Sequence, residues 1–326
     1  MHMADALVSA PVAITAGVAA TALVVVAARK ISKSTNESIV PLMGVLGAFI
    51  FAAQMINFSI PGTGSSGHIV GGILLSALLG PWAGFMTLVS VLIIQCLVFA
   101  DGGLMALGCN ILNMVACSCL VAYPLIYRPL MRYPASLTRI IGVTALASVA
   151  ALELGAMFVT LETELSGVTA LPTGKFLLFM LPIHLVIGIC EGLATAAVIY
   201  FVQRYRPALV SETANYSDTR SSVKGGLVAF LIATVVLAAG FSWIASSNPD
   251  GLEWSIMKVA GTELEITDVT GMKAEVLQNK TAILPDYESR LSGIIGAVIV
   301  MSILWSVSTI IVRRHKLKEN RRCNEK

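Results

Sequence analysis

Two of the four histidines in the sequence have the surroundings expected of metal ligands. His2 follows the first methionine in "MHMADALVSA", and His68 ends the glycine- and serine-rich stretch "SIPGTGSSGH". The amine of Met1, the backbone amide nitrogen of His2 and the His2 imidazole would close a five- and a six-membered chelate ring around one ion. The His68 imidazole would supply a fourth nitrogen. Four nitrogens in a plane are typical of Ni(II) or Cu(II), whereas zinc prefers a tetrahedron.

This chelate imposes conditions on the N-terminus. Met1 has to stay on the protein, which the bulky second residue favours, and its amine must carry no formyl group. The amine and both imidazoles must be neutral to bind, so metal affinity is expected to fall in acid. The alternative is that His2 is incidental and that His68 only hydrogen-bonds its own loop.

The remaining ionisable groups give weaker signals. His184 and Glu191 are seven residues apart and so lie on one face of a predicted helix, where either a functional site or a hydrogen-bonded structural pair would account for them. His315 lies in the basic tail "RRHKLKENRR", which is typical of a solvated surface. The six cysteines lack the paired spacing of a zinc site or a disulfide framework and indicate packing.

The composition indicates that membrane-spanning helices position these residues. Of the 326 residues, 56% are apolar and only 13% are charged, far from the balance of soluble domains. Crossing a bilayer takes about 20 helical residues. The sequence predicts an all-α polytopic bundle of nine spans, with Gly80-Pro81 dividing one long stretch into a short and a long helix. The apolar stretches are Leu7–Ala28, Pro41–Phe58, His68–Ala100 (two spans), Leu104–Tyr127, Arg139–Leu161, Phe176–Val202, Gly225–Ala245 and Leu291–Val312.

Lysine and arginine predict the orientation, because cytoplasmic loops retain them. With the N-terminus outside and the C-terminus in the cytoplasm, seventeen basic residues fall on the cytoplasmic side and five outside. His2 and His68 then lie at exterior ends of the first and third spans, on the same face of the membrane. The first span is expected to be retained rather than cleaved as a signal peptide, since Arg29, Lys30 and Lys33 follow its apolar run.

The chain is expected to divide into two membrane parts. Residues 1–201 form a seven-span block, the polar stretch 202–224 forms a cytoplasmic linker, and residues 225–326 form a two-span block. The exterior loop 246–290 contains short β-prone runs. It is large enough for a small ordered lobe but not for a catalytic domain.

Three motifs in the first block resemble a known family. "MHMAD", "GTGSSGHIVGG" and "ADGGLMALGCNILNM" are similar to the substrate-binding membrane component of nickel and cobalt importers of the energy-coupling factor type. The two-span block with "NPDGLEWSI" looks like the small accessory component of these transporters, fused into the same chain. The resemblance implies a metal site at Met1, His2 and His68, with Ni(II) or Co(II) as the substrate. Asp101 replaces a histidine of some cobalt-type relatives, which favours nickel.

The resemblance also implies partners. The family takes its energy from ATPase subunits through a coupling membrane subunit, and this chain has no G-x-x-x-x-G-K-[ST] phosphate loop, so it is not expected to be an enzyme. Gly44, Ala48 and Ala52 form a small-residue stripe that would dock the coupling subunit, and internal packing is the alternative. Four further residues are candidates for orienting the imidazoles: Asn57, Ser66, Asp101 and Asn110.

Two other functional classes stay open. An ion-gradient-driven secondary transporter of metal cations would need inverted repeats, of which none is visible, and acids near the bilayer midplane, for which Glu153 and Glu191 are the candidates. An intramembrane metalloenzyme is disfavoured, because H-E-x-x-H is absent and a filled square-planar site leaves no position for an activated water. The expected location is the cytoplasmic membrane of a prokaryote, in contact with lipid and without a nucleic-acid partner.

Overall fold

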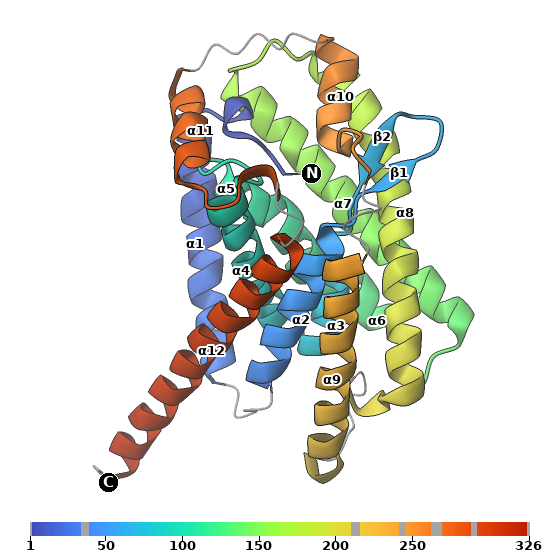
Figure 1. Ribbon diagram of the computed structural model, residues 1–326, viewed down its shortest axis with the longest axis vertical. Helices are drawn as coiled ribbons and strands as arrows, with labels where there is room; N and C mark the ends of the chain where they lie inside the picture. The colour runs from blue at the N-terminus through green and yellow to red at the C-terminus, as the bar shows by residue number, and fades with distance from the viewer. Residues whose placement is uncertain are drawn as a thin grey trace.

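The computed structural model describes residues 2–33, 39–209, 216–240, 246–261, 269–287 and 292–324. Long helices lie side by side and form most of the molecule (Figure 1). Many of their large apolar side chains point outward; Ile14, Val18 and Leu178, for example, are 66–67% exposed. Such surfaces are stable where lipid covers them. The described helices therefore form the bundle of a multi-pass membrane protein.

Five helices of the described chain are long and apolar enough to cross a bilayer. They are α1 (Ala10–Ser32), α4 (Pro81–Phe99), the continuous helix Leu107–Leu130 (α5 Leu107–Asn110, η2 Ile111–Tyr127 and α6 Arg128–Leu130), α7 (Leu137–Ser166) and α8 (Thr173–Tyr205). Three further helices have shorter apolar parts: α2 (Ile39–Gln54), α9 (Tyr216–Gly240) and α12 (Ser292–Asn324). The total of nine spans stays a prediction.

The predicted break at Gly80-Pro81 is confirmed. Helix α3 (Gly72–Leu79) ends before it, and α4 begins at Pro81. However, α3 has only eight residues and rises about 12 Å, less than half of the roughly 30 Å hydrocarbon core. The chain from His68 to Gly71 is irregular, so α3 alone is too short for the separate span predicted in this stretch.

A small β-hairpin occupies the glycine- and serine-rich loop. Strand β1 (Phe58–Ile60) pairs antiparallel with β2 (Ser65–Gly67), with Phe58 opposite Gly67. The preceding helix α2 ends at Gln54, so the second span stops short of the predicted Phe58. His68 directly follows β2, which fixes where its side chain leaves the hairpin.

The segment 246–290, predicted to be an exterior loop, contains helices and no strands in its described residues. These are two helices, α10 (Gly251–Ala260) and α11 (Val269–Thr281), and one short 3-10 turn, η5 (Pro285–Tyr287). The motif "NPDGLE" starts α10, because the Asp250 side chain accepts from the Glu253 N–H and the Glu253 side chain accepts from the Asp250 N–H. This capping box is a strong local helix signal.

The predicted linker 202–224 is partly helical. Helix α8 continues to Tyr205, a short turn η3 covers Pro207–Leu209, and α9 begins at Tyr216. The helix ends thus extend into the polar stretch, because a change to polar composition marks where a helix leaves lipid rather than where it ends.

The small-residue stripe of α2 is covered within the chain. A Cβ added at Gly44 would lie 3.4 Å from the carbonyl oxygen of Met301 in α12, and Ala48 and Ala52 are only 2% and 0% exposed. The absence of side-chain bulk lets α12 approach closely. Internal packing therefore accounts for the stripe in this structure.

The N-terminal segment, the hairpin, α10 and α11 gather at one end of the bundle, at the top of Figure 1. The last residues of α1 and α12 lie at the opposite end. A short turn, η1 (Asp5–Leu7), connects His2 to α1 at the upper end. Which membrane face each end meets stays a prediction from the lysine and arginine distribution.

Candidate metal centre

The N-terminal segment lies inside the protein rather than in solvent. Met3 is fully buried, and its N–H donates to the Asn110 Oδ1 at 2.7 Å, while the Asn110 Nδ2 donates to the Met3 carbonyl at 3.2 Å. The Gly103 N–H donates to the same carbonyl at 2.8 Å. Asn110, a predicted supporting residue, therefore fixes the backbone next to His2. Met1 lies outside the described residues.

Asp5 anchors this segment a second time. Its side chain is 1% exposed and accepts from the Leu104 N–H at 3.2 Å and from the Ala106 N–H at 2.9 Å. The sequence prediction did not assign Asp5 a role, although an acid in a mostly apolar stretch is a signal for one. The loop 101–106 and the N-terminal segment thus form one hydrogen-bonded unit.

The structure brings His2 and His68 together. Their rings are stacked, with centroids 5.3 Å apart and planes 18° from parallel. The His2 side chain is only 7% exposed. Burial lowers the pKa of both imidazoles, that of His68 to about 4, so both rings are neutral at pH 7. A neutral imidazole has a nitrogen lone pair available for a metal.

A hydrogen bond favours one ring nitrogen of His68, and a carboxylate lies beside the His2 ring. The His68 Nδ1 lies 3.1 Å from the Ile69 carbonyl oxygen, and donation to that oxygen leaves Nε2 with the lone pair. The His2 Nδ1 lies 3.3 Å from the Asp101 Oδ1. The His2 Nε2 is buried and has no hydrogen-bond partner among the described residues. Asp101 is thus the predicted supporting residue that contacts an imidazole directly.

The other two supporting candidates contact the exterior loop instead. Ser66 is fully buried, its N–H donates to the Pro249 carbonyl at 2.8 Å, and its hydroxyl donates to the Asn248 carbonyl at 2.8 Å. The Asn57 carbonyl accepts from the Ser246 N–H at 2.8 Å. These contacts hold the hairpin, and through it His68, against the chain that precedes α10.

Glu191 holds the irregular backbone after His68. Its two carboxylate oxygens accept from the Val70 N–H at 2.7 Å and the Gly71 N–H at 3.1 Å, at the start of α3. The Gln54 Nε2 donates to the Val70 carbonyl at 2.8 Å. Gly71 has φ of 82°, a conformation that favours glycine. Irregular backbone is tolerated at membrane depth when its polar groups are paired in this way.

Glu191→Ala is therefore expected to lower both the thermal midpoint and the nickel affinity. It leaves two buried N–H groups without an acceptor, each costing about 1–3 kcal/mol, and it releases the chain that carries His68. Thermal unfolding and nickel titration of the detergent-solubilised protein would measure both effects. Glu191→Gln keeps one oxygen acceptor and should lie between the two. Wild-type values for Glu191→Ala would contradict this role.

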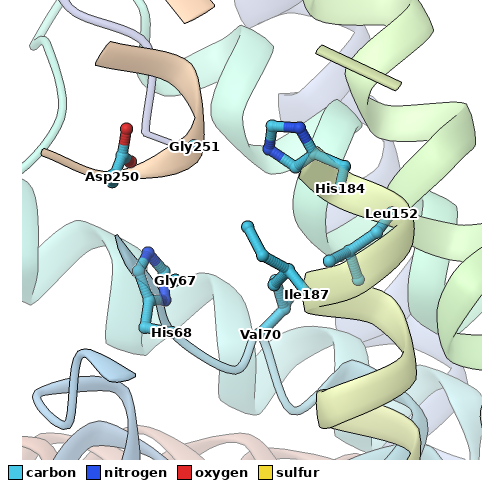
Figure 2. A pocket seen from close by; sticks show the side chains of 8 residues that line it. All are labelled: Gly67, His68, Val70, Leu152, His184, Ile187, Asp250 and Gly251. Carbon is cyan, nitrogen blue, oxygen red and sulfur yellow. The ribbon is translucent and has the colours of Figure 1, made fainter. Parts of the chain in front are cut away.

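His184 does not pair with Glu191. Its Nδ1 lies 2.8 Å from the Met180 carbonyl oxygen of its own helix, and its Nε2 is buried without a partner among the described residues. Figure 2 shows His184 across a small cavity from His68 and Asp250. The cavity is otherwise lined by Gly67, Val70, Leu152, Ile187 and Gly251. Of the two readings left open by the sequence, a direct His184–Glu191 hydrogen bond is not formed, because each side chain bonds to backbone instead.

Two known families match successive parts of the chain. Residues 2–209 match the family described as the cobalt uptake substrate-specific transmembrane region, and residues 224–313 match the PDGLE domain. A putative fused nickel transport protein, NikMN, of Archaeoglobus fulgidus is 32% identical over 285 residues, covering 82% of this chain and 85% of that protein. The fused nickel transport protein NikMN of Rhodobacter capsulatus is 28% identical over 332 residues, 95% of each chain.

Cobalt transporters and a solved structure are also similar. The cobalt transport protein CbiM of Sorangium cellulosum is 31% identical over 173 residues, 52% of this chain and 76% of that protein. A crystal structure of a transition metal transporter superposes with a TM-score of 0.55 at 30% identity, over 63% of this chain and 93% of that chain. The chain therefore belongs to the nickel and cobalt transport family, as a cobalt-uptake-type substrate-specific membrane component fused to a C-terminal PDGLE part.

Proposed function

We propose that this protein is the metal-capturing subunit of an ATP-driven nickel importer of the energy-coupling factor type, with Co(II) as a second substrate. It binds Ni(II) through four nitrogens in a plane: the Met1 amine, the His2 amide nitrogen and the imidazoles of His2 and His68. The site opens to the exterior of a prokaryotic cytoplasmic membrane. Membership of the nickel and cobalt transport family supports the substrate.

The observation that carries this proposal is the stacked pair of His2 and His68. Two imidazole nitrogens bound to one ion at about 2.0 Å each lie within about 4 Å of one another. Ring centroids 5.3 Å apart allow that spacing after small ring rotations. A six-membered chelate with the His2 amide uses Nδ1, the nitrogen beside the Asp101 carboxylate. The negative charge of Asp101 favours a cation at this place.

The remaining two donors come from backbone groups in this proposal. Among the described residues, no three His, Cys, Asp or Glu side chains gather closely enough to hold a metal ion. Two imidazoles alone do not fill a coordination sphere. The Met1 amine and the His2 amide would complete a four-nitrogen set without further side chains, which is the geometry that Ni(II) accepts and zinc does not favour.

Energy would come from partners: a coupling membrane subunit and ATPase subunits. The sequence has no phosphate-binding loop of its own. Docking of the coupling subunit on Gly44, Ala48 and Ala52 would require α12 to move, since α12 lies against Gly44. A partner surface elsewhere on the lipid-facing helices needs no such rearrangement.

An ion-gradient-driven transporter is the second candidate function, and Glu153 is the observation that favours it. Its Oε1 is buried without a hydrogen-bond partner in the described part of the chain. Glu191 is less suited to carry protons, because both its oxygens hold the start of α3. A coupling acid would have to bind and release protons during transport.

Nickel uptake into membrane vesicles tests the proposal. Vesicles that contain this chain with its coupling and ATPase partners should take up radioactive nickel only when ATP is present. Vesicles with the chain alone should bind nickel without accumulating it. Accumulation by the chain alone under a proton gradient, abolished by Glu153→Gln, would support the second candidate and contradict the first.

A further inference from the structure

We propose that Tyr287, in the PDGLE part, is a positioning residue for the metal site: it holds the Asp101 carboxylate beside the His2 Nδ1, the nitrogen that binds nickel in the proposed site. The inference rests on the proposed function, since it assigns Tyr287 a role in nickel binding at His2. It makes the accessory part a structural contributor to the site rather than a separate module.

Two contacts made by one carboxylate carry this inference. The Tyr287 hydroxyl donates to the Asp101 Oδ2 at 2.7 Å, and the Asp101 Oδ1 lies 3.3 Å from the His2 Nδ1. The two oxygens of one carboxylate thus contact the accessory part and a predicted metal ligand at the same time. With nickel on Nδ1, a carboxylate held at this place puts a negative charge next to the cation, and groups that orient such a charge tune metal affinity.

The Tyr287 ring is held so that its hydroxyl meets Asp101. It stacks on Phe99 with centroids 4.6 Å apart and planes 16° from parallel, and Phe51 lies at 6.5 Å. Phe99 and Phe51 are fully buried in the membrane component. Burial, and then the Asp101 charge, raise the pKa of Tyr287 well above its ordinary value, so the hydroxyl stays protonated and donates.

The segment that leads to Tyr287 is bonded to the same region of the membrane component. The Gln278 Nε2 donates to the Gly102 carbonyl at 2.7 Å and to the Cys96 carbonyl at 2.9 Å. The Leu284 N–H donates to the Val98 carbonyl at 2.9 Å. Three backbone carbonyls around Asp101 therefore receive donors from the PDGLE part, which brings Tyr287 to a defined place.

Backbone conformation also singles out this contact. Ala100 and Tyr287 have φ of 56° and 55°, and they are the two non-glycine residues with positive φ in the described chain. One precedes Asp101 and the other is its hydrogen-bond partner. A bulky residue in this region is strained and persists only where surrounding contacts hold it, which is common at functional sites.

Tyr287→Phe removes the hydroxyl and keeps the ring stacked on Phe99, so the fold should be preserved. With Ni²⁺ as the probe and the full chain in detergent, we expect nickel to dissociate about tenfold faster and the visible absorption band of the complex to shift. Asp101→Asn should act in the same direction. The double variant should lose no more than Asp101→Asn alone, because both residues act through one carboxylate.

Trp254→Phe is the matched control. The Trp254 Nε1 donates to the Thr63 carbonyl at 2.9 Å and so also joins the PDGLE part to the membrane component, without contacting Asp101. It should leave the absorption band unchanged.

If Tyr287→Phe keeps the wild-type dissociation rate and band while His2→Ala no longer binds nickel, this inference is overturned and the proposed function stands. If His2→Ala still binds nickel normally, the proposed function itself fails. Additive losses in the double variant would likewise overturn the shared role of Tyr287 and Asp101.

Discussion

His68→Ala is expected to lower nickel affinity by about 100-fold or more. Loss of a residue that only orients a ligand costs about 10–100-fold, so loss of a ligand itself should cost at least the upper value. The loop around His68 does not depend on its side chain, because Ser66, Val70 and Gly71 hold the backbone through other partners. The variant should therefore fold. Isothermal titration with nickel, together with the thermal midpoint, would separate the two effects.

His315→Ala is the matched control for this measurement. The substitution is the same, but His315 lies in the basic C-terminal tail, far in sequence from the N-terminal segment and the hairpin. It should leave nickel affinity unchanged. Equal losses in both variants would indicate nonspecific binding by imidazoles and would argue against a site at His68.

The second large effect concerns the N-terminus. Adding one residue before Met1, or acetylating its amine, is expected to abolish high-affinity nickel binding. An added residue moves the free amine out of the five-membered chelate ring, and acetylation removes its lone pair. Neither change alters the hydrogen bonds that hold this segment in place. The Asp5 carboxylate accepts from backbone N–H groups of the loop 101–106, and the Asn110 side chain donates to the Met3 carbonyl. The thermal midpoint of the metal-free protein should stay unchanged.

One residue added after Lys326 provides the control for this experiment. That change alters the length and the terminal group of the chain at its other end and should not affect nickel binding. Wild-type affinity in the N-terminally extended protein would rule out the amine as a ligand. It would leave His2 and His68 to bind the ion with a different donor set.

Local patterns were sufficient to predict the five long apolar helices of the described chain and one break between helices. Apolar runs gave the long helices, and Gly80-Pro81 marked a boundary because proline cannot continue a helix and suits a first turn. In the segment 246–290, the Asp250–Glu253 capping box starts α10, a helix that was not predicted from the apolar runs.

The candidate site was only partly predictable, because its supports are distant in sequence. The spacing of chelate donors identified His2 and His68, and the structure places them side by side. The role of Glu191 was not predictable, since its partners Val70 and Gly71 are 121 and 120 residues away. Tyr287 lies 186 residues from Asp101 and has no local signature at all. Contacts of this kind depend on how the helices pack.

The most direct test of the central claim is the metal content and visible spectrum of the protein purified with its native, untagged N-terminus and loaded with nickel. The proposed site predicts one nickel ion per chain in a yellow, diamagnetic complex, because a plane of four nitrogens pairs the d electrons of Ni(II). A paramagnetic, octahedral spectrum, or nickel that binds equally well after the amine is blocked, would contradict it.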